Sequence, residues 1–349
     1  MRRASLALLV CAMVVTACCP PVLAFDPPGA AAATVDFQAR FDSAWGLVAE
    51  RYWDLEGLAV DWDEVGARYR ARLAEIDDED SLYTMLEEMY AEIGDNHSVY
   101  VPPYRVAEIR AAYGDLPCVA VFDSSATVPL RSAALLARAQ VPAGVDVQSS
   151  GPVEYGFTTS GSLHIGYLRL ADLASDGTAR GLRSAVERLD AAGAEALVLD
   201  LRGNPGGRLV TMMQAAGVFT SGFLWRAVMS WTFPLPYPAI GETLSDLPLV
   251  VLIDGGVNSA AEGLAGALQA NGRAFLVGET TAGNVEAVLP FCLRDGSQAW
   301  IATGVLAPLL GPTWEGRGVE PDLVTAPQEA FARAVEHLES TAVNGSDQP

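Results

Sequence analysis

From Ser162 onward, the chain alternates short apolar runs with segments of helical pattern. The apolar runs span Leu163–Leu170, Ala196–Leu201, Leu247–Ile253 and Ala274–Val277. The helical patterns lie near 178–191, 209–219 and 260–270. Apolar runs this short indicate buried strands, and their alternation with helices favours a largely parallel sheet covered by helices. We therefore predict a layered α/β domain over residues 161–340, followed by a polar tail at 341–349.

Three helical patterns precede this domain, and in each the apolar and aromatic residues recur every three or four positions. The three stripes span Phe37–Tyr52, Trp62–Ile76 and Leu82–Ile93. Asp61 is the expected N-cap of the second helix, Ser81 the start of the third and Gly94 its end. The stripes are most simply a hydrophobic core, so residues 36–101 are predicted to form a small helical domain.

Two other regions give weaker or more local signals. Residues 102–160 are expected to be a short connecting segment, with a helix around Ser132–Ala139. Near the end, two apolar runs flank Arg294-Asp295-Gly296-Ser297, which indicates a hairpin.

The first 24 residues have the features of a secretion signal, because Arg2-Arg3 precede an apolar run that is too short to cross a membrane. Two processing sites compete within it. Val15-Thr16-Ala17-Cys18 resembles a lipobox, which would lipidate Cys18, whereas Val22-Leu23-Ala24 resembles an ordinary signal-peptidase site. Residues 25–35 are rich in Pro, Ala and Gly and are predicted to be a tether. We expect export to the periplasm, cell envelope or exterior, with lipid anchoring if Cys18 is used.

The composition restricts the class of partner. The formal net charge is −21, and the chain contains no lysine. Such an acidic protein is a poor ligand for nucleic acid, and no cofactor motif is present. Cys118 and Cys292 are the two cysteines beyond the leader, and pairing and two separate buried thiols are equally consistent with the sequence. Neither has a His or Cys close by in sequence, so no metal site is expected.

Ser259 stands where the buried strand Leu247–Ile253 turns into the helix Ala260–Ala270. Small residues surround it in Asp254–Ser259, which exposes a hydroxyl and aims the first free N–H groups of the helix at its target. A nucleophilic serine needs both features. On this segment alone, a simple N-cap role is the stronger interpretation.

Two further segments carry candidate chemistry. Asp200–Gly207 follows a buried strand, and its consecutive glycines leave backbone N–H groups approachable by an oxyanion. No lysine follows in the spacing of a phosphate-binding loop, so nucleotide binding is not expected. Among the three histidines, His97 alone lies in a short polar turn, whereas His164 lies in a predicted strand and His337 on a charged face of the C-terminal helix.

In their order and spacing, these segments resemble the serine peptidase family of the tail-specific (carboxyl-terminal processing) proteases and the tricorn core protease. The resembling segments are Glu92–His97, Gly166–Leu170, Asp200–Gly207, Asn258–Glu262, Gly278–Gly283 and Glu315–Asp322. The resemblance implies a crotonase/ClpP-like layered α/β peptidase domain after the helical domain. It covers most of the chain.

The resemblance also implies roles for individual residues. One branch of the family uses a lysine base at the position of Asn284, which a chain without lysine lacks. The other branch resembles a Ser–His–Glu system, which implies Ser259 as nucleophile and His97 as general base. Glu315 would orient the histidine, with Glu320 as the alternative. The oxyanion donors would be the backbone N–H of Ala260 and that of Gly206 or Gly207.

The chain also departs from the family pattern. The segment after His97 is too short for a PDZ domain, which many tail-specific proteases use to hold a substrate carboxyl terminus. No propeller region of the tricorn type is present. Asn96 and Ala282 stand where Ser and Phe are common.

The function that these observations favour is an exported serine peptidase that acts on unfolded proteins or peptides. One rival is a non-catalytic ligand- or peptide-binding protein on the same fold. A second rival is an α/β-hydrolase esterase, which would want Gly-x-Ser-x-Gly and a late histidine such as His337. Ser259 lacks that glycine frame, so the esterase is the weaker rival.

Overall fold

The computed structural model describes residues 36–95, 97–113, 141–175, 177–230 and 232–346. The secretion signal with Cys18, the tether, the helix expected at 132–139, Cys118 and Asn96 lie outside the described residues. The chain divides into two compact units. The first comprises the segment up to 121 together with 230–235 and 288–303, and the second comprises 122–229, 236–287 and 304–349.

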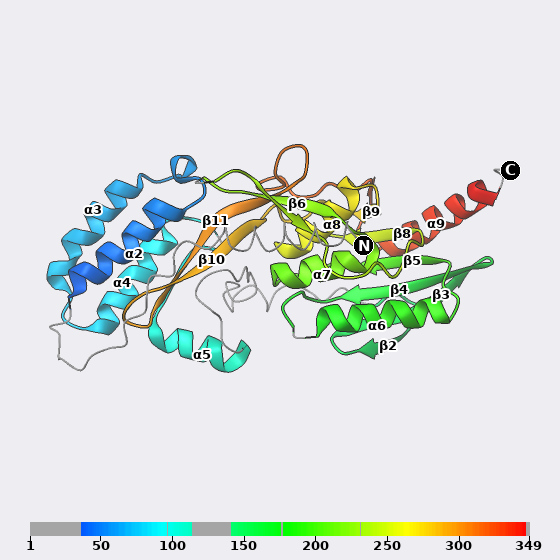
Figure 1. The fold of residues 1–349 in the computed structure, drawn as a ribbon, viewed down its shortest axis with the longest axis horizontal. Coiled ribbons are helices and arrows are strands. Elements are labelled where there is room, and N and C mark those ends of the chain that lie inside the picture. Colours follow the sequence, from blue (N-terminus) through cyan, green and yellow to red (C-terminus); the bar gives the residue numbers. More distant parts are fainter. Residues whose placement is uncertain (1–35, 96, 114–140, 176, 231, 347–349) are drawn as a thin grey trace, which may run out of the picture. The chain divides into compact units, whose positions relative to one another are not determined.

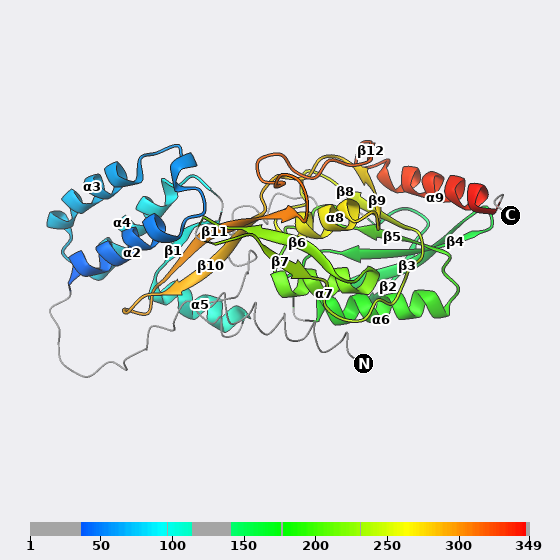
Figure 2. The same ribbon diagram turned by 45° about the horizontal axis from the view of Figure 1, so that its top comes forward.

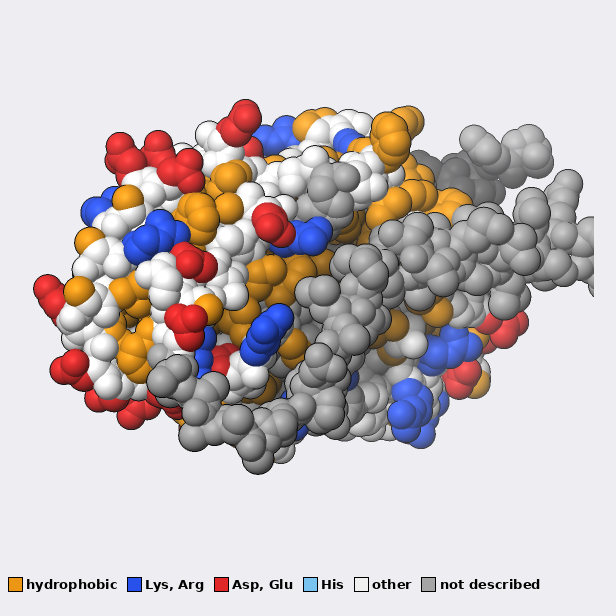
Figure 3. All heavy atoms as spheres, turned by 60° about the vertical axis from the view of Figure 1, so that its left-hand side comes forward, with side chains coloured by type: hydrophobic (Ala, Val, Ile, Leu, Met, Phe, Trp, Pro, Cys, Tyr) orange, Lys and Arg blue, Asp and Glu red, His pale blue; other side chains and the backbone are white. Residues whose placement is uncertain are grey.

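The first three helices of the first unit confirm the three predicted stripes: α2 (Phe37–Arg51), α3 (Trp62–Arg72) and α4 (Glu79–Ala91) (Figure 1). Asp61 caps α3 as expected, because its side chain accepts hydrogen bonds from the N–H groups of the first turn. The N-cap of α4 is Asp78, not Ser81, since the Asp78 side chain accepts the Ser81 N–H. Figure 3 shows the acidic side chains spread over the surface of this unit.

Residues from far along the sequence complete the core of the first unit. The hairpin predicted around 294–297 is confirmed: β10 (Glu286–Cys292) pairs with β11 (Gln298–Pro308). The first part of β11 also pairs antiparallel with β1 (Val99–Val101). Ala299, Ile301 and Ala302 are fully buried in one cluster with the aromatic residues of the three helices. The stretch expected to be a connector contains α5 (Pro103–Tyr113).

A seven-stranded sheet organises the second unit. In spatial order its strands are β12 (Leu323–Val324), β9 (Phe275–Gly278), β8 (Leu249–Ile253), β5 (Ala196–Asp200), β4 (Leu163–Leu170), β3 (Val153–Ser160) and β2 (Asp146–Ser150). The strands from β12 to β4 are parallel, as the alternation predicted, and β3 and β2 extend the sheet antiparallel.

Helices cover both faces of this sheet (Figure 1, Figure 2). They are α6 (Thr178–Ala191), α7 (Leu209–Phe219), α8 (Ala260–Ala270) and α9 (Ala330–Ser346). Side chains alternate along β5: Leu197 and Leu199 belong to the core with α6, α7 and α8, whereas Ala196 and Val198 pack with α9. The predicted layered α/β fold is therefore confirmed. The carboxyl ends of the parallel strands then meet at one edge, where ligands bind in open α/β sheets.

The five-stranded sheet that contains β1, β10 and β11 has two further strands. β6 (Phe223–Val228) pairs antiparallel with the last part of β11, and β7 (Leu235–Pro238) lies beyond β6. Within the described part of the chain, no helix is both long and apolar enough to cross a membrane.

Candidate active site

Ser259 occupies the turn between β8 and α8 in an unusual backbone conformation. Its φ is 55° and its ψ is −124°, and it is the one non-glycine residue with positive φ among those described. Such a conformation costs about 1–3 kcal/mol and persists only where the surroundings enforce it. The side chain is 4% exposed. A strained turn at the end of a buried strand therefore carries the predicted nucleophile.

Glu262 is the group that enforces this turn. Its Oε2 accepts the N–H of Ser259 at 3.0 Å and that of Asn284 at 2.9 Å. Its Oε1 accepts the Thr281 hydroxyl at 2.5 Å and the Gly283 N–H at 2.6 Å. Burial raises the pKa of Glu262, and these four hydrogen bonds partly offset the increase. Glu262 had no predicted role, although the Ser-x-x-Glu spacing of a capping box marks it.

The glycine turn after β5 lies directly against Ser259. A Cβ at Gly206 would stand 2.7 Å from the Asn258 carbonyl oxygen, 2.9 Å from the Ser259 Cβ and 3.0 Å from the Ala260 nitrogen. Because real Cβ atoms do not approach backbone this closely, only glycine fits here. The structure thus brings the two predicted segments together.

The backbone N–H groups expected to bind an oxyanion differ in whether they already donate a hydrogen bond within the protein. The Ala260 N–H donates no hydrogen bond to any part of the chain that the structure describes, and it faces the glycine turn. The Gly206 N–H donates to the Asn204 side-chain oxygen at 2.9 Å. Gly207 forms an isolated parallel bridge with Leu173. The Gly206 N–H is therefore already engaged, whereas that of Ala260 is available to an oxyanion.

Glu315 and Glu320, the two candidate orienting carboxylates, lie in different surroundings. Glu315 Oε2 accepts the Val285 N–H at 2.6 Å, beside the segment whose backbone holds Ser259. Glu320 is exposed, and its carbonyl accepts a hydrogen bond from Gln269, ten residues along α8 from Ser259. Ten residues of helix span about 15 Å. The geometry of the second unit favours Glu315.

His97 belongs to the first unit, where its turn is tightly fastened. The side chain is 3% exposed. The backbone N–H of His97 donates to Asp95 Oδ1 at 2.9 Å, and the Ser98 hydroxyl donates to Asp95 Oδ2 at 2.7 Å. The Ser98 oxygen in turn accepts the Ala302 N–H of β11 at 3.0 Å. A buried histidine on a rigid turn suits a base that must be held in one orientation.

The remaining histidines and cysteines have other surroundings. His164 lies exposed on β4. The charged face predicted for His337 is wrong, because its ring stacks on Phe275 with centroids 3.8 Å apart. Cys292 is disulfide-bonded. Over the described residues, no three His, Cys, Asp or Glu side chains gather as metal ligands would.

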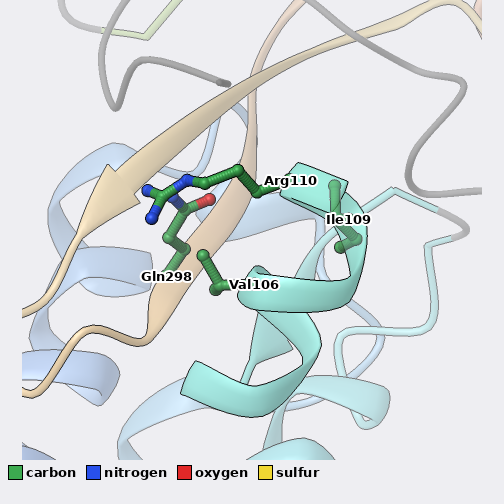
Figure 4. A pocket seen from close by; sticks show the side chains of 4 residues that line it. All are labelled: Val106, Ile109, Arg110 and Gln298. Atoms are coloured by element: carbon green, nitrogen blue, oxygen red, sulfur yellow. The ribbon is translucent and has the colours of Figure 1, made fainter. Parts of the chain in front are cut away.

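A small hollow between α5 and β11 is not a substrate site. Val106, Ile109, Arg110 and Gln298 line it, and its volume is about 10 Å³ (Figure 4). That is room for about one water molecule.

Comparisons with known proteins agree with this geometry. The family model of peptidase family S41 matches residues 164–325, which include both the glycine turn and Ser259. This part of the chain belongs to peptidase family S41. The model of the tricorn protease C1 domain matches residues 34–91, so the N-terminal helices resemble that domain.

Curated relatives match about half of the chain. A carboxyl-terminal-processing protease of Picosynechococcus sp. is 36% identical over 173 residues, which are 49% of this chain and 41% of that protein. The carboxy-terminal-processing protease of Bartonella bacilliformis is 31% identical over 174 residues, or 46% and 38% of the two chains. The chain therefore spans less than half the length of these relatives.

Solved structures share the fold over a greater length. A photosystem II D1 C-terminal processing protease superposes with a TM-score of 0.63 at 21% identity, covering 86% of this chain and 97% of that one. A lipoprotein from Streptococcus agalactiae gives 0.63 at 14% identity, covering 90% and 100%. At these identities the likeness concerns the fold alone.

Proposed function

We propose that the protein is an exported serine peptidase that hydrolyses peptide bonds of unfolded proteins or peptides. Ser259 attacks the carbonyl carbon, and His97 takes the hydroxyl proton and returns it to the leaving amine. Glu315 orients the imidazole. The N–H of Ala260 and one from the glycine turn stabilise the oxyanion. The observation that carries the proposal is the strained Ser259 turn, with an available N–H beside it and the glycine turn against it.

The test is hydrolysis of casein and fluorogenic peptides by the purified protein near neutral pH. We expect Ser259→Ala and His97→Ala each to lower kcat/KM by about a thousandfold or more. If His97→Ala stays active while Ser259→Ala is inactive, another group is the base.

The two candidate carboxylates form a matched pair for the same assay. Glu315→Gln keeps the shape of the side chain but removes the charge that stabilises an imidazolium, so kcat should fall. Glu320→Gln should leave activity near that of the wild type. The reverse ranking would assign the orienting role to Glu320.

The rival function remains a non-catalytic protein that binds a ligand or peptide. If the wild type cleaves no peptide, and a fluorophosphonate probe fails to label Ser259, the binding function replaces the peptidase. The enclosed hydrogen-bond network around Ser259 favours the peptidase, because a mere binding surface does not require a strained serine.

Export is proposed from the leader, and the disulfide at Cys292 supports it, because such bonds persist in oxidising compartments. The intact mass of the mature protein tests the route. Lipidation at Cys18 predicts a start at that residue with added acyl chains, whereas cleavage after Ala24 predicts an unmodified start at Phe25. Retention of residues 1–24 in the cell-associated protein would contradict export.

A further inference from the structure

Asn204 connects three segments at the carboxyl edge of the sheet and is fully buried. Its Nδ2 donates to the Leu170 carbonyl at the end of β4 at 2.9 Å, and its Oδ1 accepts the Gly206 N–H at 2.9 Å. Its own carbonyl accepts the Asn258 N–H at 3.0 Å, and its N–H donates to Leu201 at 2.9 Å. Every polar group of this residue is thus engaged.

The amide has only one orientation that satisfies both side-chain contacts. The NH₂ group must face the Leu170 carbonyl, and the oxygen must face the Gly206 N–H, since the reverse would set donor against donor and acceptor against acceptor. The carboxamide therefore holds the N–H of Gly206 in place.

The other side of Gly206 is fixed as well. Its carbonyl accepts the Leu173 N–H at 2.8 Å. Because the peptide is planar and trans, the Gly207 N–H points away from that carbonyl. Because its N–H and its carbonyl are both hydrogen-bonded, Gly206 stays against the Ser259–Ala260 peptide. Only a residue without a Cβ fits in that position.

We propose that Asn204 is a positioning residue whose carboxamide holds the Gly206–Gly207 backbone against Ser259 and so shapes the oxyanion pocket. The proposal rests on the proposed peptidase function. It assigns Asn204 an effect on the transition state, which appears in kcat, and not on substrate affinity.

Asn204→Asp tests this without changing the size of the side chain. A neutral carboxyl group reproduces both contacts, because its carbonyl accepts from Gly206 and its O–H donates to Leu170. The ionised form places a negative oxygen against the Leu170 carbonyl. Burial disfavours the ionised form. Among the described residues, the charged groups near the turn include Asp172, Asp200, Arg202, Arg208, Asp254 and Glu262.

We expect the ratio of kcat for Asn204→Asp to kcat for the wild type to fall by about a hundredfold as the pH rises through the titration of the new carboxyl group. KM should change little. Dividing by the wild-type kcat at each pH cancels the pH dependence that the catalytic base gives to both proteins. Asn204→Leu should lose a similar factor at every pH.

Asn271→Asp is the matched control. Asn271 Nδ2 also donates to a backbone carbonyl, that of Ala267, but at the far end of α8. Its kcat ratio should not depend on pH. A constant ratio for Asn204→Asp, or a change in KM alone, would overturn the proposal.

Amide hydrogen exchange of the peptide 203–208 separates this proposal from the peptidase function. In Asn204→Asp the Gly206 N–H should exchange faster at high pH than in the wild type after correction for intrinsic rates, while the melting temperature at low pH stays close to that of the wild type. An inert wild type would refute the peptidase, and unchanged exchange at Gly206 would then still refute the positioning role.

Discussion

Ser259, the proposed nucleophile, has a backbone conformation that glycine tolerates better. Replacement by glycine should therefore relieve strain that alanine retains. We expect Ser259→Gly to unfold with a free energy about 1 kcal/mol above that of Ser259→Ala, after the larger entropy of unfolded glycine is subtracted. Urea denaturation of the two variants measures this.

Ser340 supplies the control, because it lies exposed within α9. In a helix interior, glycine is less favourable than alanine by about 1 kcal/mol, so the ranking there should reverse. If alanine proves the more stable residue at 259 as well, the strain at Ser259 does not exist.

Single residues differ in how far the sequence predicts them. The position of Ser259 and of the glycine turn between a strand and a helix was predictable from the local pattern of small residues. The role of Ser259 was not, because the segment alone favoured an N-cap and only the resemblance over several segments implied a nucleophile. Asn204 and Glu262 act through partners on other loops, such as Leu170, Thr281 and Asn284. Their roles depend on which loops meet at the sheet edge, and no local pattern contains that information.

At the scale of a turn, a comparison of Gly206 with Gly222 separates the effect of a Cβ collision from that of backbone strain. Both have positive φ, at 96° and 90°, so alanine strains both backbones. A Cβ meets nothing within 4 Å at Gly222 but collides with the Ser259 turn at Gly206. We expect Gly206→Ala to lower kcat by about a hundredfold or more, since displacement of a reacting group by about 1 Å has that effect. Peptide hydrolysis measures it.

Gly222→Ala should fold with a modest loss of stability and retain kcat. If both variants lose kcat equally, backbone strain and not the collision controls the site.

The strand β11 contributes to two hydrophobic cores. Ile301 is fully buried with the N-terminal helices, whereas Leu306 belongs to the core of the second unit. We expect each alanine substitution to lower the free energy of unfolding by about 3 kcal/mol. Hydrogen exchange should distinguish them, because Ile301→Ala speeds exchange in α4 and Leu306→Ala speeds it in α8. Faster exchange of α4 in both variants would show that the cores are not separate.

Elements buried on both faces were the ones that the sequence predicted well, because their apolar runs stand out. β5 and β8 are buried along their whole length. β2 reads Asp-Val-Gln-Ser-Ser and is mostly exposed, so its pairing with β3 had no apolar signal. The predicted start of α4 at Ser81 was wrong because Asp78 is an equally good cap three residues earlier.

At the scale of the molecule, the first unit is not a continuous piece of chain. Its core needs Ala299, Ile301 and Ala302 from β11. A fragment that ends at residue 121 should therefore be helical but lack a cooperative thermal transition and near-UV aromatic signal. Circular dichroism tests this.

The same fragment joined through a flexible linker to residues 288–303 is the matched control. It should regain cooperative unfolding, since the missing strands return. Cooperative unfolding of the shorter fragment alone would contradict the role given to β11.

Because the first unit needs β11, its core can form only late in the synthesis of the chain. Ribosomes add about 5–20 residues per second, and roughly 200 residues separate Tyr90 from Ala299. The N-terminal helices therefore emerge some 10–40 seconds before the strand that buries their aromatic face. During that interval the nascent chain keeps this face open, a state that chaperones and export machinery can hold. Late completion of the core thus delays folding of the first unit until β11 has been synthesised.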